Sequence, residues 1–146
     1  MSIRGIAEGN LRATLYSATI TTAIAGVGQT PVIGLTKTKM LVVEAQFVYG
    51  SGGTSADCYV QTSLDGGLTW FDIANFHFTT ASLNKVSAVV MNPATPPTVA
   101  QAPGSAALAS NTVINGLIGD MFRALITTLG TYAGGTTLRV DMVAKG

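Results

Sequence analysis

The stretch that most constrains the fold runs from Ser55 to Phe78, where two strand-like segments flank a short glycine-containing turn. Residues 58–64 alternate with the period of two that is typical of a half-buried strand. The turn Asp65-Gly66-Gly67 supplies residues that tolerate positive φ, which a tight hairpin requires. Residues 69–73 are rich in aromatic and β-branched side chains, which favour a returning strand. The stretch therefore predicts a β-hairpin.

The same hairpin contains the spaced motif Ser-x-Asp-x-Gly-x-Thr-Trp, made of Ser63, Asp65, Gly67, Thr69 and Trp70. The motif resembles the Asp-box hairpin of sialidases and other β-propellers, in which the Ser, Asp and Thr side chains bond the turn backbone and the Trp packs beneath it. The resemblance implies a structural role for these five residues and no catalytic one. A sialidase would need several copies, an arginine cluster and a far longer chain, and this sequence has one copy.

The chain is poor in charge. Its 146 residues suit one domain with a substantial core. Only 10% of them are charged, against roughly 25% in an ordinary soluble domain. The mean hydropathy is +0.43 and the formal net charge is +1. No run of about 18 apolar residues is present, so we expect no membrane-spanning segment. We therefore expect the apolar surface to be buried against other protein subunits.

The chain termini and the single cysteine bear on the compartment. We expect no signal peptide, because the start of the chain, Met1-Ser2-Ile3-Arg4, is followed by glycines and Glu8 and not by an apolar segment. A lone cysteine, Cys58, cannot form an intrachain disulfide, which fits synthesis in the cytoplasm. We expect Cys58 to be a small core residue. The near-neutral charge argues against direct nucleic-acid binding.

We expect an N-terminal arm over residues 1–16 that lies across a neighbouring subunit or is a frayed end, and one domain over residues 17–146. Strand signals in the domain lie at residues 17–25, 39–49, 55–64, 69–78, 82–91, 112–114, 120–129 and 136–144. We expect Gly26-Val27-Gly28 to break the first of them. Seven or eight short strands, glycine-rich turns and almost no helix predict an all-β fold, an antiparallel two-sheet β-sandwich or jelly roll.

Residues 92–111 differ from the rest of the chain. They are rich in Ala, Ser and Thr and hold four of the five prolines, which are Pro93, Pro96, Pro97 and Pro103. A segment of this composition cannot sustain a strand ladder. It is also too long to be only a connecting loop in a compact domain. The segment is either disordered or an extended loop that becomes ordered on a partner. We favour ordered contact because charge is nearly absent from it.

The sequence offers no recognisable site for catalysis, a cofactor or a metal. The sole histidine, His77, lies between two inward-facing phenylalanines, so we expect it at the solvent or at a subunit boundary. Asp65 and Asp72 bracket the hairpin and could hold calcium, but turn bonding and solvent exposure are the favoured interpretation. The chain has no nucleophile elbow and no phosphate-binding glycine loop. We therefore predict a protein that is not an enzyme.

Three stretches together carry a wider resemblance: residues 1–12, residues 61–74, and residues 130–141 with the Val-Ala-Lys at 143–145. They resemble small virion structural proteins of tailed bacteriophages, of the head decoration or cement type. The resemblance implies a jelly roll or related sandwich that oligomerises, as a dimer or trimer, on the outer capsid surface and bridges neighbouring major capsid subunits. The expected partners are thus the major capsid protein and further copies of the chain.

We expect the arm and the 92–111 segment to make the inter-subunit contacts, through Arg4, Arg12, Pro93, Pro96, Pro97 and Pro103. One alternative is a tail, neck or fibre-associated virion protein. The other is a carbohydrate-binding module, in which exposed Trp70, Phe71 and Tyr59 would stack on sugars. A cross-strand core pair of Tyr59 and Trp70 would explain these aromatic residues without a ligand.

Overall fold

The structure is a computed structural model that describes residues 11–91, 101, 104 and 106–146. These residues form β-strands, turns and loops without a helix, and every strand pairing among them is antiparallel. The all-β, antiparallel part of the fold prediction is therefore confirmed. The strands are β1 (Leu11–Thr19), β2 (Ile24–Gly28), β3 (Met40–Val48), β4 (Ser51–Gly52), β5 (Ser55–Ser63), β6 (Phe71–Phe78), β7 (Leu83–Val90), β8 (Met121–Leu129), β9 (Tyr132–Ala133) and β10 (Thr137–Lys145).

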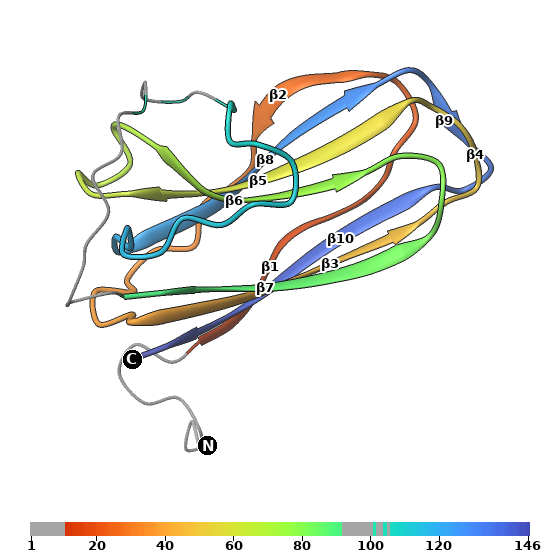
Figure 1. The fold of residues 1–146 in the computed structure, drawn as a ribbon. Helices are drawn as coiled ribbons and strands as arrows, with labels where there is room; N and C mark the ends of the chain where they lie inside the picture. Colours follow the sequence, from red (N-terminus) through yellow and green to blue (C-terminus); the bar gives the residue numbers. More distant parts are fainter. Residues whose placement is uncertain (1–10, 92–100, 102–103, 105) are drawn as a thin grey trace, which may run out of the picture.

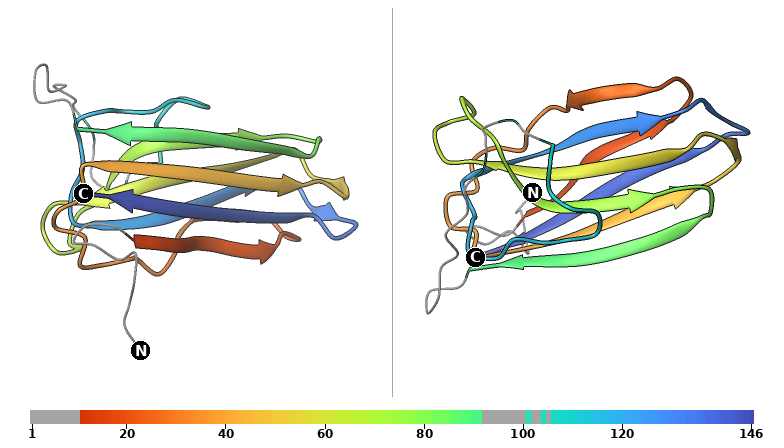
Figure 2. Two further views of the ribbon diagram at one scale, coloured as in Figure 1. Left: turned by 90° about the horizontal axis from the view of Figure 1, so that it is seen from below. Right: turned by 45° about the horizontal axis from the view of Figure 1, so that its top comes forward.

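The long strands form two four-stranded sheets, with the orders β1-β10-β3-β7 and β2-β8-β5-β6. The short strands β4 and β9 pair with each other at one end of the molecule. Figures 1 and 2 show the two sheets as stacked layers, an arrangement compatible with a β-sandwich. The chain passes repeatedly from one sheet to the other, so residues distant in sequence are neighbours in space.

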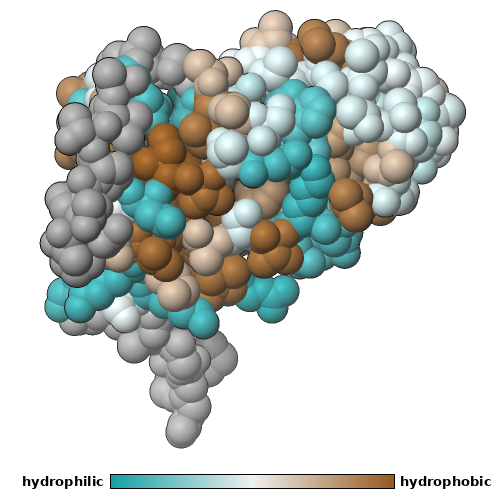
Figure 3. Space-filling view, viewed as in Figure 1, coloured by the Kyte–Doolittle hydropathy of each residue, from teal (hydrophilic) through white to brown (hydrophobic). Residues whose placement is uncertain are grey.

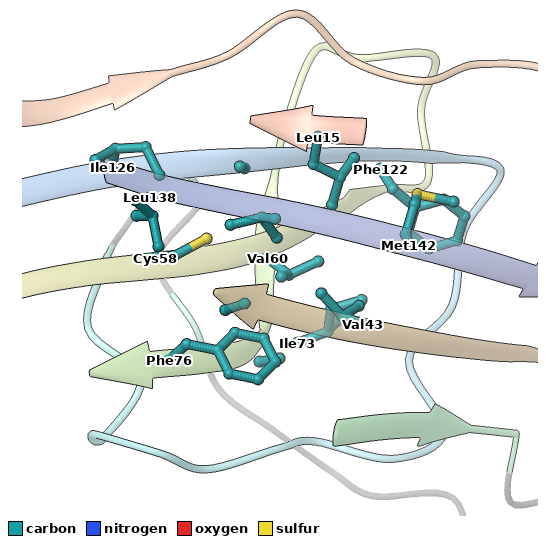
Figure 4. Close-up of a cluster of buried hydrophobic side chains, with 14 of the residues drawn as sticks. Leu15, Val43, Cys58, Val60, Ile73, Phe76, Phe122, Ile126, Leu138 and Met142 are labelled. Atoms are coloured by element: carbon teal, nitrogen blue, oxygen red, sulfur yellow. The ribbon is translucent and has the colours of Figure 1, made fainter. Parts of the chain in front are cut away.

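The core lies between the two sheets and follows from the alternation in the sequence. In β3, Leu41, Val43, Ala45 and Phe47 are all buried, and the residues between them face outward. The inward side chains of β5, β8 and β10 meet those of β3 in one apolar cluster, shown in Figure 4. Removing this surface from water is the main stabilising contribution to such a fold.

An aromatic cluster closes the core at the end that carries β4 and β9. The ring of Phe47 stacks on that of Phe78 at a centroid distance of 5.0 Å and meets Tyr132 edge-on at 5.7 Å. The Tyr132 hydroxyl donates a hydrogen bond to the Thr79 carbonyl at 2.9 Å. Gly53 has a φ of 69°, and a Cβ atom there would lie 2.3 Å from the Tyr132 ring, so only glycine fits.

The predicted arm was wrong for residues 11–16, because they belong to β1, which pairs with β10 along its whole length. A register shift between Thr14 and Tyr16, at the buried Leu15, changes the phase of the alternation and explains why the periodicity was not visible. Residues 1–10, including Arg4, lie outside the described residues.

The strand prediction for residues 17–25 was also wrong. The chain leaves the first sheet after Thr19 and starts β2 at Ile24, so Gly26-Val27-Gly28 lies within a strand and does not break one. Gly26 has a φ of 60°, and the β2–β8 register shifts between Ile24 and Val27, which accommodates the glycine. The predicted strand at 112–114 reduces to an isolated bridge between Val113 and Ala74.

Candidate functional site

The turn at residues 63–70 is held by its own side chains. The Ser63 hydroxyl accepts a hydrogen bond from the Gly67 N–H at 2.8 Å. The Asp65 Oδ1 accepts from the N–H groups of Leu68 and Thr69 at 3.1 and 2.9 Å, and the Thr69 hydroxyl donates to its Oδ2 at 2.6 Å. The bond from the Thr69 side chain is the largest of the effects that lower the pKa of Asp65 to about 2. The turn thus uses both carboxylate oxygens for its own structure.

Trp70 lies beneath this turn and is nearly inaccessible. Its indole N–H donates to the Gly67 carbonyl at 3.1 Å, and its exposed fraction is 7%. The Arg123 guanidinium covers the Trp70 ring at 4.4 Å from its centroid. Sugar stacking on Trp70, as the carbohydrate-binding alternative requires, is therefore wrong for this geometry. The expected Tyr59–Trp70 pair is also wrong, because Tyr59 stands opposite Asn75.

A chain of buried polar side chains continues from Arg123 across the sheet. The Arg123 Nε donates to the Gln61 Oε1 at 2.9 Å, and the Gln61 Nε2 donates to the Asp72 Oδ1 at 2.8 Å. Gln61 and Asp72 are almost fully buried. A bulge in β6 next to Ile73 shifts the strand by one residue and places Asp72 opposite Gln61. Burial of such polar groups is tolerated because their hydrogen bonds are satisfied.

Asp72 also fixes part of the proline-rich segment to its own chain. Its Oδ2 accepts hydrogen bonds from the Ala107 and Leu108 N–H groups at 2.9 and 3.1 Å. The Gln101 side chain donates to the Asp72 carbonyl and accepts from its N–H, both at 2.9 Å. The described part of the 92–111 segment therefore contacts β6. The candidate contact residues Pro93, Pro96, Pro97 and Pro103 lie outside the described residues.

The next residues cover the free edge of β6. The Asn75 N–H donates to the Thr112 carbonyl at 2.9 Å, and the Ile114 N–H donates to the Ile73 carbonyl at 2.8 Å. The chain then reaches the end of β7, where the Gly116 N–H donates to the Val90 carbonyl at 2.7 Å. Figure 1 shows this segment, in teal, passing in front of β6. The β6 edge of the second sheet is thus closed by the chain itself.

His77 is part of a polar cluster next to this edge. Its Nδ1 lies 2.9 Å from the Asp57 Oδ1, and its side chain is 30% exposed. The Asn75 amide reaches the same Asp57 oxygen at 3.3 Å. Lys85 donates to the Asn111 Oδ1 at 2.8 Å and to the His77 carbonyl. Among the described residues, no hydroxyl or thiol is hydrogen-bonded to the His77 ring.

The outer face of the sheet β1-β10-β3-β7 combines charged and apolar groups. Asp141 accepts hydrogen bonds from the Thr14 hydroxyl at 2.6 Å and from the Arg139 Nε at 2.8 Å. Burial alone would raise the pKa of Asp141, but these bonds and the positive charges of Arg139 and Arg12 hold it below its usual value. Arg12, a candidate contact residue, lines a shallow hollow of about 550 Å³ on this face, together with Val86 and Val143.

Large apolar side chains are exposed at several further places. Figure 3 shows apolar residues gathered in patches on the face that carries β6 and β7. Among the residues that the structure describes, the exposed large apolar ones are Val27, Ile33, Val48, Leu64, Leu68, Leu83, Val86, Met91, Leu129 and Val143. A mixture of apolar and polar groups is typical of protein interfaces. The outer face and the patches are therefore the candidate interaction surfaces.

Comparisons with protein-family models, with curated proteins and with solved structures find no match. Within the described ranges, no group of three or more His, Cys, Asp or Glu side chains could hold a metal ion. None of the described residues belongs to a helix that could cross a membrane.

Proposed function

We propose that the protein is a non-enzymatic virion structural protein that decorates and stabilises a bacteriophage capsid. It acts as a homo-oligomer on the outer capsid surface and bridges major capsid subunits. The observation that carries the proposal is the strand order, taken together with the sequence resemblance to decoration proteins.

The strand order supports a jelly roll. Without the short β4 and β9, the eight long strands form two sheets in which the first strand lies beside the last and the second beside the seventh. This nesting of early and late strands is the pattern of the double-sheet jelly roll, an architecture of viral capsid and lectin domains. Because one fold hosts many functions, the fold alone does not select between these classes.

The surface favours the capsid class over the lectin class. A chain with 10% charged residues and several exposed large apolar side chains is suited to a subunit that shares extensive interfaces. The sugar site expected from the sequence required an exposed Trp70, and Trp70 is instead buried and covered by Arg123. The tail, neck or fibre alternative shares fold and composition, and it differs in the number of copies on each particle.

The mechanism is stabilisation by mass action. A protein that binds the assembled shell, and not its loosened form, shifts the equilibrium toward the assembled state as its concentration exceeds Kd. In this proposal the outer face of the sheet β1-β10-β3-β7, with Arg12, contacts the shell. The arm with Arg4 and the proline-rich segment supply further inter-subunit contacts.

The test is the composition and structure of particles assembled in cells that express this chain with its neighbouring virion genes. We expect ordered density on the outer shell in cryo-electron microscopy, repeated at every local symmetry axis of one type. Density restricted to one vertex or to the tail would favour the alternative. Absence of the chain from purified particles would contradict both virion proposals.

Variants locate the contact. Arg12→Glu places a negative charge in the hollow and should lower occupancy on the particle. Lys39→Glu is the matched control, because it makes the same change in charge at an exposed residue that does not line the hollow. Equal occupancy for the two variants would exclude this face as the contact.

A further inference from the structure

The edge strand β7 has a regular register that defines the direction of its backbone groups. It pairs with β3 without interruption from Met40↔Val90 to Phe47↔Leu83. The Met91 N–H donates to the Lys39 carbonyl, so the odd-numbered residues of β7 direct their N–H and C=O groups toward β3. The even-numbered residues direct theirs away from the sheet.

At one end of β7 the outward backbone N–H and C=O groups are hydrogen-bonded, and along the rest of the strand they are open. Val90 accepts from the Gly116 N–H at 2.7 Å and donates to the Asn115 Oδ1 at 3.0 Å. In the described part of the chain, the outward N–H and C=O groups of Asn84, Val86 and Ala88 have no hydrogen-bond partner. These three residues therefore present a short template for a further strand.

The other edges are covered or interrupted, and β7 is not. The β6 edge is covered by residues 111–114, and β1 carries a bulge at Leu15 and the exposed charge of Arg12. The β2 edge is only five residues long and carries a register shift at Gly26. Edge strands usually carry such protection against pairing with other chains. β7 has no proline and no bulge. Two of its apolar residues, Val86 and Leu83, are 62% and 53% exposed.

The only charge on β7 does not guard the edge. Lys85 is directed to the side of β6, where its ammonium group donates to the Asn111 Oδ1 and the His77 carbonyl. The ammonium nitrogen also lies over the Phe78 ring, 4.9 Å from the ring centroid. A second β7 strand can therefore approach without facing an exposed charge.

The sequence of β7 is compatible with pairing to itself. In an antiparallel pair centred on Val86, this residue faces the same residue of the second copy, and Asn84 faces Ala88. Each of these pairs belongs to the outward row and can exchange both hydrogen bonds. Lys85 then faces Ser87, so the two lysines do not oppose each other.

We propose that two copies of this chain dimerise by antiparallel pairing of their β7 edges about a two-fold axis at Val86, forming one continuous eight-stranded sheet. The proposal deepens the self-association in the proposed function and rests on that part of it. The interface is isologous and closes after two copies, so it does not propagate into a fibre.

The first test is sedimentation velocity of the purified chain over a range of concentrations, with Val86→Pro as the variant. Proline removes the outward N–H and is tolerated at a strand edge. Loss of the two hydrogen bonds exchanged by the Val86 pair should weaken the dimer about thirtyfold. Ser17→Pro is the matched control. Ser17 belongs to β1, the edge strand on the other side of the same sheet, where it lies opposite Arg139 of β10 and its N–H points outward from the sheet. It should leave the dimer unchanged.

The second test introduces charge at the exposed residue Val86. Val86→Lys and Val86→Glu should each weaken the dimer about fivefold, because like charges would face each other across the axis. Mixing the two variants should restore association, since opposite charges then face. Failure of the mixture to associate better than either variant alone would overturn the Val86 register.

Other outcomes separate this inference from the proposed function. A wild-type chain that is monomeric at every soluble concentration, or that loses its association in Ser17→Pro, would overturn the β7 pairing. If that chain still occupies the particle, the capsid proposal stands. A chain that dimerises through β7 and is absent from the particle would support the dimer and refute the capsid proposal.

Discussion

Replacing Asp72 by asparagine should destabilise the fold, because no orientation of the new amide satisfies its surroundings. The carboxylate receives only donors: the Gln61 amide at Oδ1, and the Ala107 and Leu108 N–H groups at Oδ2. If the new NH₂ faced the Ala107 and Leu108 N–H groups, it would replace the acceptor of both bonds with a donor. If it faced Gln61, the Gln61 amide would have to flip so that its oxygen accepts from the new NH₂. The Gln61 NH₂ would then face the Arg123 Nε, which now donates a hydrogen bond to the Gln61 Oε1.

The magnitude follows from the second, less costly orientation. It breaks the bond between Arg123 and Gln61, and a hydrogen bond to a charged group contributes about 1.5–3 kcal/mol. It also turns two charge-assisted bonds, from Ala107 and Leu108, into weaker neutral ones. We expect Asp72→Asn to lower the free energy of unfolding by about 3 kcal/mol. For a chain of this length, the corresponding drop in Tm is about 6 to 12 °C.

The assay is urea and thermal unfolding followed by the fluorescence of the single tryptophan, Trp70, which packs against Arg123 in the same network. Asp141→Asn is the control, because that carboxylate bonds to the half-exposed Arg139 and should cost less than about 1 kcal/mol. A loss below about 1 kcal/mol for Asp72→Asn would refute the reasoning about its buried network.

Two further predictions concern titratable groups. Because the pKa of Asp65 is lowered to about 2 from 3.8, its contribution to stability is complete above the unfolded-state value and is lost as the pH falls toward 2. Thermal melts between these pH values should show this loss in the wild type and not in Asp65→Asn, and identical profiles would contradict it. Burial raises the pKa of the Cys58 thiol to about 12, so a disulfide reagent at neutral pH should label it only in denaturant. Rapid labelling of the folded chain would contradict its core position.

The strands that could be predicted from the sequence are those with undisturbed alternation. Residues 39–49, 82–91, 120–129 and 136–144 correspond to β3, β7, β8 and β10, each with its ends displaced by one residue at most. In β3, β8 and β10 one face is buried throughout, so the period of two is clear, whereas β7 is exposed along much of both faces. Sheet membership was not predictable, because alternation shows which face is buried and not which strands are neighbours.

Bulges account for what the sequence did not reveal. At Leu15 a register shift mixes the two faces of β1, so residues 11–16 did not show a strand pattern. In β6 the bulge at Ile73 places Asp72 opposite Gln61, where an uninterrupted register would have placed Ile73. The buried network of Asp72, Gln61 and Arg123 was therefore not foreseeable from spacing. Its only sequence signal is that each of these polar residues lies within a predicted strand.

The two sheets differ in how their edges are treated, and this difference bears on assembly. In the second sheet, Asp72 anchors Ala107 and Leu108, and the chain that follows closes the β6 edge. In the first sheet, β7 keeps open backbone groups beside exposed Val86, and the outer face carries the hollow with Arg12. A protein that evolved as a monomer would be expected to protect every edge, because an open edge promotes aggregation. The open β7 edge therefore favours a role for the first sheet in contacts between subunits.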